Sequence, residues 1–600
     1  MVQHNHVWWL RTALLITLCG VVACGDDESA ANATENDSNN DKDDAGSNGN
    51  DVFGNAQDDV LFVDTGPKPE VDGITADEDS SSLEDGGLFL DTSAEVGTDS
   101  VLDDSSAHIT NPSDGGENPD VSLSDTPSVD VGTGNDMGIA DVDPTDAGYS
   151  DFSSTADVTQ PWTGPLWDMT KIADPQTANC LFTNQKTVFK DGVLLDVWNV
   201  TYTSWESINE TLVPITIKAF AARPKTLTSN APAIIVAHGL GGFAEEDNAT
   251  SHAARLSLFT LAYTGPGGGN APDNTSEGLG AAANGGKRMF DTIPDPRGSW
   301  FWAHATAAMR GLTCLAAHPD VDPNRLGITG FSAGGVVSLI AASVDGRIKA
   351  AVPLSGTGQW DIATQSPNAW QHSLLKQAGL DTTSPEWNIL VSQVEPGALT
   401  QNAMANVLMV NGSTDEFFPL TAHVATYDPI PNATKRTSIA GNFDHGCYSL
   451  TGVENASAIE ERAKIRAEGG QKMMFAHTFG TDSNYSYVPL PPQVQVTPIG
   501  AAMAVVAAVD SGGSKLQVKE VTFWGSNDDA FFWGSAKLDA AGGGLYQAVI
   551  PVPMQSNTTY YVDVEYQTKA VLFPERFSIS SVPFIPPGFV PHIRDINSCL

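Results

Sequence analysis

The chain has 600 residues, with 73 acidic against 30 basic side chains and a formal net charge of −43 at pH 7. No basic cluster of the kind that displaces counterions from phosphates is present, which excludes nucleic acid as a partner. Residues 25–160 contain 35 acidic residues and only two lysines, Lys42 and Lys68, so that segment alone contributes about −33 of the charge. The remainder of the chain is only mildly acidic.

Residues 1–24 have the features of an export signal. Arg11 supplies a positive charge, and residues 13–23 form an apolar run of eleven. Such a run is too short to span a bilayer, which needs about 20 residues, and suits a cleaved signal. It ends in Val21-Val22-Ala23-Cys24-Gly25, which resembles the lipobox of bacterial lipoproteins. The resemblance implies lipid attachment at Cys24 and a place in the cell envelope as an outer-membrane lipoprotein, on the periplasmic side or the cell surface. An ordinary signal peptide with an incidental cysteine is the alternative.

Residues 25–160 are predicted to be a disordered acidic tether. The segment is rich in Asp, Ser, Asn, Gly and Thr and contains no Trp or Cys. It cannot bury enough apolar surface to offset the entropy of the chain. A flexible chain of this length spans about 60–70 Å. The tether would hold a folded domain well away from its anchor.

Residues 161–488 alternate between strand and helix patterns. Residues 233–237 form a short, continuous apolar run that is typical of a strand buried on both faces. Alternation of this kind predicts a mostly parallel sheet with helices on both faces, in the α/β class. The other strands are expected at residues 197–204, 213–221, 259–263, 326–329, 350–354, 406–410 and 437–440, and helices at 300–317, 334–343 and 457–468.

Residues 489–600 show strand patterns only. Tyr560, Val562, Val564 and Tyr566 alternate with polar residues, which indicates one buried and one solvated face. About seven short strands in such a length predict a small all-β sandwich of immunoglobulin-like type. The strands are expected at residues 493–497, 501–509, 515–524, 531–537, 545–552, 559–566 and 577–585. Trp524 and Trp533 are interpreted as core residues, with carbohydrate binding as the alternative.

The strongest chemical signal is Gly330-Phe331-Ser332-Ala333-Gly334. A strand is predicted before it and a helix after it, which is the context of a nucleophile elbow. The small residues let strand and helix approach closely, and the helix N-terminus presents free N–H groups. Ser332 is therefore the candidate nucleophile.

A serine hydroxyl needs a base that is itself oriented by an acid, and both should follow the serine in the chain. Asp415 follows the predicted strand 406–410, and His445 follows the predicted strand 437–440. Glu416 and Asp444 are rival acids, less favoured because Asp415 begins its loop and Asp444 adjoins the histidine. The predicted triad is Ser332, His445 and Asp415.

The segment His238-Gly239-Leu240-Gly241-Gly242 follows the strand 233–237. That position supplies one backbone N–H of an oxyanion hole, and the residue after the nucleophile, Ala333, supplies the other. The candidates are Ala333 with Leu240, or with Gly241 in its place. His238 is expected to brace the loop rather than to ionise. Residues 263–269, rich in glycine, are expected to form a flexible loop over the site.

With these motifs, residues 168–478 resemble the α/β-hydrolase superfamily, and most of all its branch of dienelactone hydrolases and acetyl xylan esterases. The resemblance implies a serine hydrolase that needs no metal or cofactor and cleaves carboxylic esters, either small molecules or polysaccharide esters. A serine peptidase of the prolyl-oligopeptidase or X-prolyl type is the alternative, and a non-catalytic surface binding protein is a third interpretation. The insert between residues 356 and 401, with three tryptophans, is expected to form a lid.

Four cysteines remain after the signal: Cys180, Cys314, Cys447 and Cys599. In an exported protein they can form two disulfides. The sequence leaves all three pairings open, and the wide spacing does not resemble a zinc site.

Overall fold

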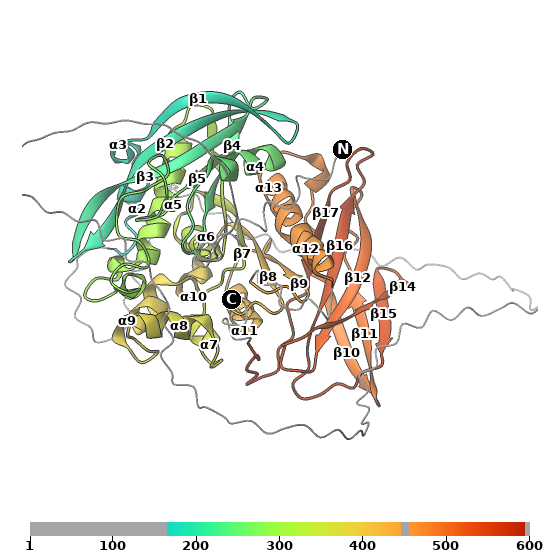
Figure 1. Ribbon diagram of the computed structural model, residues 1–600. Coiled ribbons are helices and arrows are strands. Elements are labelled where there is room, and N and C mark those ends of the chain that lie inside the picture. Colours follow the sequence, from blue (N-terminus) through green and yellow to red (C-terminus); the bar gives the residue numbers. More distant parts are fainter. Residues whose placement is uncertain (1–164, 446–454, 594–600) are drawn as a thin grey trace, which may run out of the picture. The chain divides into compact units, whose positions relative to one another are not determined.

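The computed structural model describes residues 165–445 and 455–593, drawn in colour in Figure 1. These residues belong to one compact unit. The predicted signal with Cys24 and the predicted tether lie outside the described residues. Within the described residues, no helix is both long and apolar enough to cross a membrane.

Six parallel strands form the centre of the sheet. In spatial order they are β5 (Phe259–Tyr263), β4 (Ala231–Ala237), β6 (Val321–Phe331), β7 (Ile348–Leu354), β8 (Asn406–Gly412) and β9 (Arg436–Ala440). Each is hydrogen-bonded in parallel to its neighbour. All seven residues of β4 are buried, as expected for a strand covered on both faces. The predicted parallel core is confirmed, with strand ends within a few residues of the expected ones.

Three long antiparallel strands extend one side of this core. They are β1 (Leu181–Lys190), β2 (Val193–Ile208) and β3 (Thr211–Pro224), and β3 pairs with β5. Both β2 and β3 are longer than predicted, because their ends beyond the apolar stretches pair with each other from Leu195↔Pro224 to Ile208↔Thr211. The strand β1 was not predicted at all. It lies at the edge of the sheet, is mostly exposed, and has no regular apolar alternation to reveal it.

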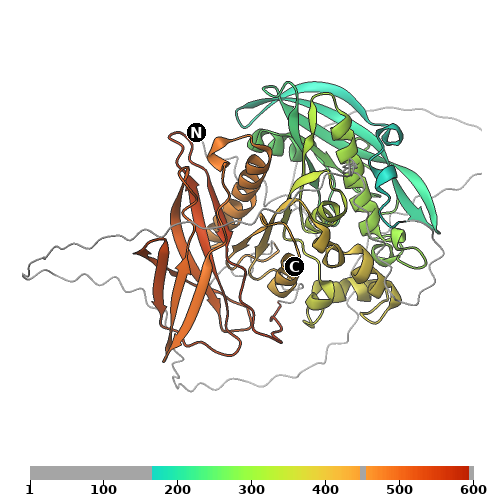
Figure 2. The ribbon, with the colours of Figure 1, turned by 180° about the vertical axis from the view of Figure 1, so that it is seen from behind.

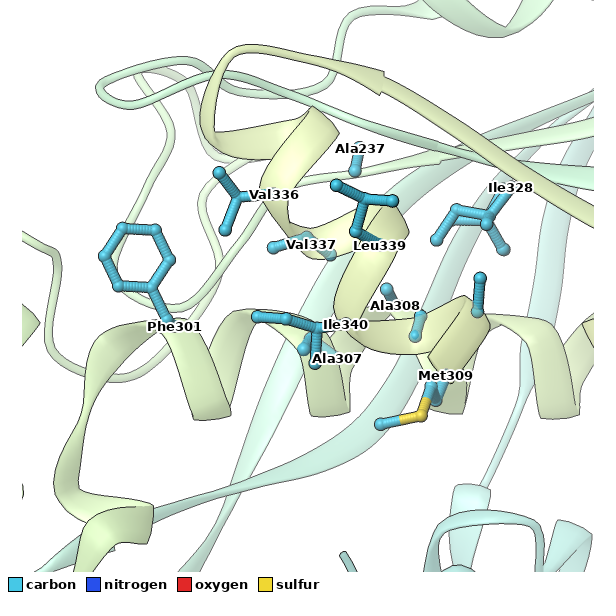
Figure 3. Packing of buried hydrophobic residues seen from close by; sticks show 14 of the residues in the cluster. Ala237, Phe301, Ala307, Ala308, Met309, Ile328, Val336, Val337, Leu339 and Ile340 are labelled. Carbon is cyan, nitrogen blue, oxygen red and sulfur yellow. The ribbon is translucent and has the colours of Figure 1, made fainter. Parts of the chain in front are cut away.

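Helices cover both faces of the sheet. On one face α5 (Trp300–Ala317) and α6 (Ala333–Val344) pack on each other and on the sheet, as Figure 3 shows. On the other face lie α4 (Glu246–Leu256) and α13 (Gly470–Phe479). Alternate residues of β4 separate the two cores: Ile235 faces α5 and α6, while Ile234 and Val236 face α4 and α13. This is the two-sided covering that the sequence predicts.

The insert between residues 356 and 401 folds into short helices. They are α7 (Trp360–Ala363), α8 (Trp370–Gln377), α9 (Pro385–Ile389) and α10 (Pro396–Leu399). Trp360 is only 1% exposed, and its ring lies 5.0 Å from that of Phe301 and 6.3 Å from that of Trp387. These aromatic contacts join the insert to the core of α5 and α6.

The C-terminal strands form two antiparallel groups. The strands β10 (Gln493–Ile499), β11 (Ala502–Ala508), β15 (Leu545–Ile550) and β14 (Asp539–Gly542) make a separate sheet. The strands β17 (Arg576–Ser580), β16 (Thr559–Thr568), β12 (Leu516–Ser526) and β13 (Gly534–Lys537) instead continue the main sheet, which reaches 13 strands. The junction is an antiparallel pairing of Ser580 on β17 with Thr437 on β9.

The all-β character of this region is confirmed, but four of its strands belong to the same sheet as the parallel core. Figures 1 and 2 show β17 and β16 beside β9 and α12 (Ala456–Lys464). Both strand groups contribute to one apolar core, which also includes α13. The predicted boundary at residue 488 therefore separates two strand sets within a shared sheet and core. The immunoglobulin-like arrangement stays a prediction.

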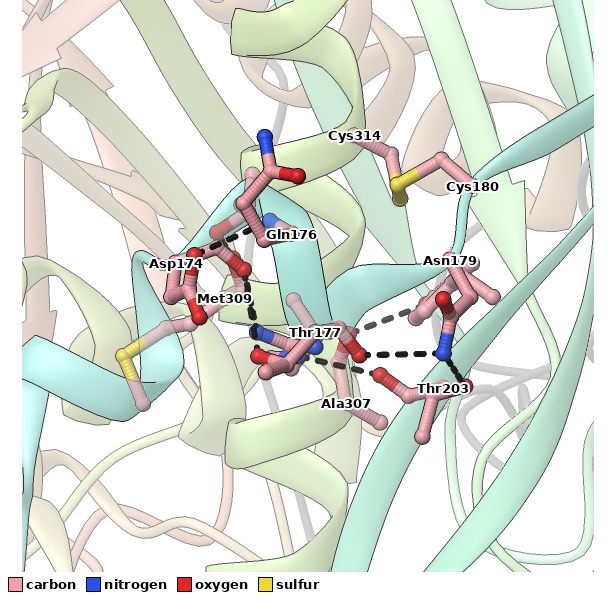
Figure 4. The surroundings of a disulfide bond; sticks show 12 residues. Asp174, Gln176, Thr177, Asn179, Cys180, Thr203, Ala307, Met309 and Cys314 are labelled. Atoms are coloured by element: carbon pink, nitrogen blue, oxygen red, sulfur yellow. Dashed lines mark hydrogen bonds between the residues drawn. A yellow bond between two sulfur atoms is a disulfide. The ribbon is translucent and has the colours of Figure 1, made fainter.

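A disulfide joins Cys180, just before β1, to Cys314 on α5 (Figure 4). Only one of the three pairings that the sequence leaves open includes a Cys180–Cys314 bond, and the structure agrees with that pairing. Cys447 and Cys599 lie outside the described residues. Arg310, on the same helix, donates hydrogen bonds to the carbonyl groups of Lys171 and Asp174. The N-terminal segment of the described chain is thus fixed to α5 by a covalent bond and by a buried guanidinium.

Candidate active site

Ser332 occupies the turn between β6 and α6. Its backbone has φ 59° and ψ −123°, a conformation rarely adopted by residues other than glycine. The turn is closed by backbone packing: a Cβ on Gly334 would lie 2.2 Å from the carbonyl oxygen of Ala237, and one on Gly330 would lie 2.5 Å from that of Gly334. The strand, strained turn and helix that the sequence predicts are all present.

The three residues predicted to form a triad lie in hydrogen-bonding order. Asp415 follows β8 and His445 follows β9, at the same end of neighbouring parallel strands as Ser332. His445 Nε2 is 2.8 Å from Ser332 Oγ, and His445 Nδ1 is 3.0 Å from Asp415 Oδ2. The Asp415 carboxylate also accepts the N–H groups of Phe417 and Phe418, which fixes its direction. The geometry brings together Ser332, His445 and Asp415.

The rival acid Glu416 binds a different part of the same histidine. Its carboxylate accepts the backbone N–H of His445 at 2.9 Å, whereas the Asp415 carboxylate contacts the ring. Asp444 is buried beside the histidine in sequence. Asp415 is thus placed to orient the imidazole ring, and Glu416 to hold the backbone of the same residue.

Electrostatics favour a basic His445. Burial lowers its pKa, but the charge and hydrogen bond of Asp415, followed by the charges of Glu416 and Asp444, raise the pKa above its ordinary value. The Nδ1 proton is held by Asp415, so Nε2 is left to accept the proton of the Ser332 hydroxyl. Burial and the neighbouring Asp415 and Asp444 raise the pKa of Glu416 to about 7.

Aromatic side chains surround the imidazole. The ring of Phe417 stacks on His445 at 4.2 Å and that of Phe331 at 5.0 Å, each with a 30° interplanar angle. Trp370, from the predicted lid insert, stacks in turn on Phe417 at 4.7 Å. These ring contacts were not predicted from the sequence, although Phe331 adjoins the nucleophile and Phe417 lies two residues from the acid. Their closeness in sequence to Ser332 and Asp415 was the feature from which a contact with the site could have been predicted.

The candidate oxyanion loop forms a turn beside the nucleophile. The N–H of Gly242 donates to the carbonyl oxygen of Gly239, and Gly241 has φ 72°, as the third residue of a type II turn requires. A Cβ on Gly239 would lie 3.3 Å from Ser332 Cβ, so the turn is in contact with the nucleophile. Leu240 and Gly241 are its two central residues. Ala333 is the first residue of α6, where N–H groups have no partner within the helix.

His238 braces this turn. One ring nitrogen, Nδ1, lies 2.6 Å from the carbonyl oxygen of Gly239, and Nε2 accepts the N–H of Gly265 at 2.7 Å. Burial lowers its pKa to about 4, so the ring is neutral at physiological pH. The glycine-rich segment after β5 was expected to be a flexible loop. Its backbone is hydrogen-bonded within the fold, because Gly265 donates to His238 and Gly267 donates to the carbonyl oxygen of Glu277; its flexibility stays a prediction.

A cavity of about 190 Å³ lies next to the candidate site, on the α4 and α13 side of the sheet. Its described lining includes Gly239 and Phe331, both of which contact residues of the triad. Ser332 and His445 are not among its described lining residues. The cavity therefore adjoins residues that contact the triad, with Phe331 both lining it and stacking on His445. In the described part of the chain, no group of three or more His, Cys, Asp or Glu side chains is arranged to hold a metal ion.

Comparison with known proteins agrees with the predicted resemblance. Residues 192–449 match the model of the acetyl xylan esterase family. A 4-O-methyl-glucuronoyl methylesterase of Podospora anserina is 23% identical over 236 residues, which are 34% of this chain and 48% of that protein. The chain thus spans about half the length of the curated relative that it matches.

The solved structures that match include two acetyl xylan esterases. The enzyme of Paenibacillus sp. R4 has 18% identity and a TM-score of 0.40, with 49% of this chain and 89% of that chain covered. The enzyme of Thermoanaerobacterium sp. JW/SL YS485 has 19% identity and a TM-score of 0.38, with 50% and 93% covered. The family match confirms the resemblance to serine hydrolases of the acetyl xylan esterase branch and supports a carboxylic ester hydrolase.

Proposed function

We propose that this chain hydrolyses carboxylic esters of carbohydrates through an acyl-enzyme formed on Ser332. One observation carries the proposal: Asp415, His445 and Ser332 form a continuous hydrogen-bonded relay that ends at the N-terminus of α6. The strained backbone of Ser332 supports it, because such strain is found where function requires a side chain to be exposed at a turn.

In the first half-reaction, Ser332 Oγ attacks the ester carbonyl carbon and His445 Nε2 takes the hydroxyl proton. Asp415 holds the imidazole in the required tautomer and stabilises the imidazolium that forms. His445 then gives the proton to the oxygen of the leaving alcohol, which departs and leaves the acyl group on Ser332. In the second half-reaction, water attacks the acyl-enzyme by the same route and releases the acid.

The negative charge of each tetrahedral intermediate needs N–H donors near Ser332. The Ala333 N–H meets this need at the start of α6, where the helix dipole adds to the attraction. We assign the second donor to Leu240, since its N–H directly follows Gly239, the residue in contact with Ser332. Gly241, on the same turn, is the alternative.

Two findings support an esterified sugar or polysaccharide as the substrate class. The family whose model matches is named for the deacetylation of xylan, and the curated relative is named for a glucuronoyl methyl ester.

We also propose that the enzyme is anchored in a bacterial cell envelope through lipid at Cys24. This rests on the apolar run and the lipobox-like motif of the sequence. Metabolic labelling of the expressed full chain with a palmitate analogue tests it: wild type should be labelled and Cys24→Ser should not. Equal labelling of both would refute the anchor.

The catalytic proposal is tested with a chain lacking residues 1–160, treated with a fluorophosphonate probe and with p-nitrophenyl acetate. Labelling should occur at Ser332, and Ser332→Ala or His445→Ala should lower kcat by roughly 10⁵–10⁶-fold. Ser343→Ala is the matched control, because Ser343 lies on the same helix α6 and only donates to the carbonyl oxygen of Leu339.

A substrate panel then separates the alternatives. Acetylated xylan and glucuronoyl methyl esters should be cleaved faster than peptide p-nitroanilides. Preference for the anilides would favour the peptidase interpretation, and a folded protein that neither labels nor turns over any substrate would contradict the catalytic proposal.

A further inference from the structure

The C-terminal strands contact the loop that carries His445. Ser580 on β17 pairs with Thr437 on β9, and its hydroxyl oxygen accepts the N–H of Ile439 at 2.8 Å. These contacts fix the end of β9. The strand ends at Ala440, and Phe443 and His445 follow in the loop directly after it. Support for the histidine therefore comes from a part of the chain more than 130 residues farther on.

A pair of reciprocal hydrogen bonds lies closer still to the histidine. The Asn442 side-chain amide donates to the carbonyl oxygen of Trp533 at 2.8 Å, and the Trp533 N–H donates to Asn442 Oδ1 at 2.9 Å. Both residues are buried, at 3% and 1% exposure. The N–H of Asn442 also donates to the hydroxyl oxygen of Ser413, two residues before Asp415. Asn442 thus joins the C-terminal region to the loops of both His445 and Asp415.

Packing reinforces these bonds. A Cβ on Gly441 would lie 2.5 Å from the indole ring of Trp524, so the loop backbone runs directly against that ring. Arg462 lies over the same indole at 4.9 Å and donates to the carbonyl oxygen of Gly441. Trp524 and Trp533 belong to one buried cluster with Tyr561. Both tryptophans are core residues of the kind predicted, and both pack against the histidine loop.

We propose that the C-terminal β-region is a positioning element for His445, with Asn442 and Trp533 as its main contact. The inference rests on the proposed function, since it assigns this region a role in that same site. Catalytic groups need to be held to within about 0.5 Å of their productive geometry. A loop after the last parallel strand has no following parallel strand to hold it, and here the C-terminal region supplies the missing neighbour.

Asn442→Gly is the sharpest test. Asn442 has φ 57°, a left-handed conformation that glycine adopts without strain, so the substitution removes the amide while the native backbone conformation stays accessible. Its loss leaves the buried N–H and carbonyl of Trp533 without these partners, which favours rearrangement of the loop. We expect kcat to fall about 10–100-fold with KM within about threefold.

Asn209→Gly is the matched control. Asn209 has φ 48° and is exposed at the turn between β2 and β3, so the same substitution there changes the backbone preference equally but touches neither loop. It should leave kcat and KM unchanged. Ser580→Ala, which removes the acceptor of the Ile439 N–H, is a second and milder variant, expected to lower kcat severalfold.

The readouts distinguish positioning from mere stability. In folded Asn442→Gly, judged by circular dichroism, fluorophosphonate labelling of Ser332 should slow with kcat, and the acid limb of the pH profile should shift because the Asp415–His445 contact changes. Unchanged kcat in folded Asn442→Gly and Ser580→Ala would overturn the proposal. If Asn442→Gly does not fold, Ser580→Ala alone decides. Absence of labelling in wild type would instead refute the proposed function itself.

Discussion

The turn that carries Ser332 and the loop that carries His445 are built in different ways. The Ser332 turn is formed by residues adjacent in sequence, and its glycines contact the backbone of β4 next to it. The His445 loop is held by Trp533, Trp524 and Ser580, which lie about 80 to 140 residues farther along the chain. The motif of the turn is therefore contiguous in sequence and packs on the backbone of the neighbouring strand, whereas the His445 loop depends on side chains of distant segments.

Because of this difference, we expect the Ser332 turn and the His445 loop to differ in how well they tolerate substitutions. The Ser332 turn is fixed by backbone atoms that cannot move without breaking the central sheet. The His445 loop is fixed largely by side chains, and each can be altered separately. We expect substitutions at the turn to affect folding and activity together, whereas substitutions around the loop should separate the two.

Among substitutions that keep both Ser332 and His445, the largest fall in kcat is expected at the acid that orients His445. Asp415→Asn keeps the shape of the side chain but favours the wrong imidazole tautomer, so kcat should fall by about 10⁴-fold. Steady-state kinetics with p-nitrophenyl acetate measures this. If Glu416→Gln were inactive and Asp415→Asn active, the assignment of the acid would be reversed.

Gly334→Ala tests the rigidity of the turn. The added Cβ would lie 2.2 Å from the carbonyl oxygen of Ala237 within the central sheet, so we expect a loss of about 4 kcal/mol or more in unfolding free energy and little remaining activity. Urea denaturation measures the stability. Gly346→Ala is the control, because Gly346 is exposed with no atom within 4 Å of an added Cβ.

Gly441→Ala makes the comparison direct. There the added Cβ would meet the side chain of Trp524, not backbone, and a ring can shift more easily than a strand. We expect a smaller loss of stability than for Gly334→Ala, with a clear fall in kcat. Equal losses of stability at the two glycines would show that the loop is as rigid as the turn.

The sequence predicted the local half of the site better than the distant half. Gly330, Ser332 and Gly334 form a motif whose geometry follows from neighbouring residues, and the structure has the expected turn. The positions of Asp415 and His445 could be predicted because both follow apolar strands. The contact between Asn442 and Trp533 could not, because nothing in either segment specifies its partner. The same reason explains why the C-terminal strands were expected to form a separate sandwich: the pairing of β17 with β9 rests on Ser580 and Thr437, which carry no pairing signal.

The disulfide offers a test away from both regions. Replacing Cys180 and Cys314 together by alanine removes a cross-link between residues 134 positions apart, which should cost about 2–4 kcal/mol of unfolding free energy. Cys180 precedes β1 and Cys314 lies on α5, and neither segment carries a triad residue, so kcat at 25 °C should change less than twofold. A large fall in kcat without unfolding would show that α5 transmits changes to the site and would weaken the division into two regions.

The smallest effect is expected from substitution of Glu416, whose contribution to the free energy of unfolding depends on pH. Burial, with the charges of Asp415 and Asp444, raises the pKa of Glu416 to about 7 in the folded protein from an ordinary value of 4.5. The folded state then binds this proton more tightly than the unfolded state does. The resulting stability is fully present below the ordinary pKa and is lost as pH rises through about 7. In alkaline solution, where Glu416 is ionised, its buried charge therefore lowers the free energy of unfolding.

Glu416→Gln removes this loss of stability, because glutamine is neutral at every pH and its carbonyl oxygen can still accept the His445 N–H. The variant should exceed wild type in unfolding free energy by about 1–3 kcal/mol at pH 9 and lose this advantage near pH 5. Glu416 is also one of the charges that raise the pKa of His445, so the acid limb of kcat/KM should move to lower pH in the variant. Urea denaturation at the two pH values and a pH–rate profile measure both effects. A variant less stable than wild type at pH 9 would mean that the carboxylate bonds to the histidine loop outweigh the desolvation of the charge, and the loop would then depend on ionised Glu416 as much as on Asn442.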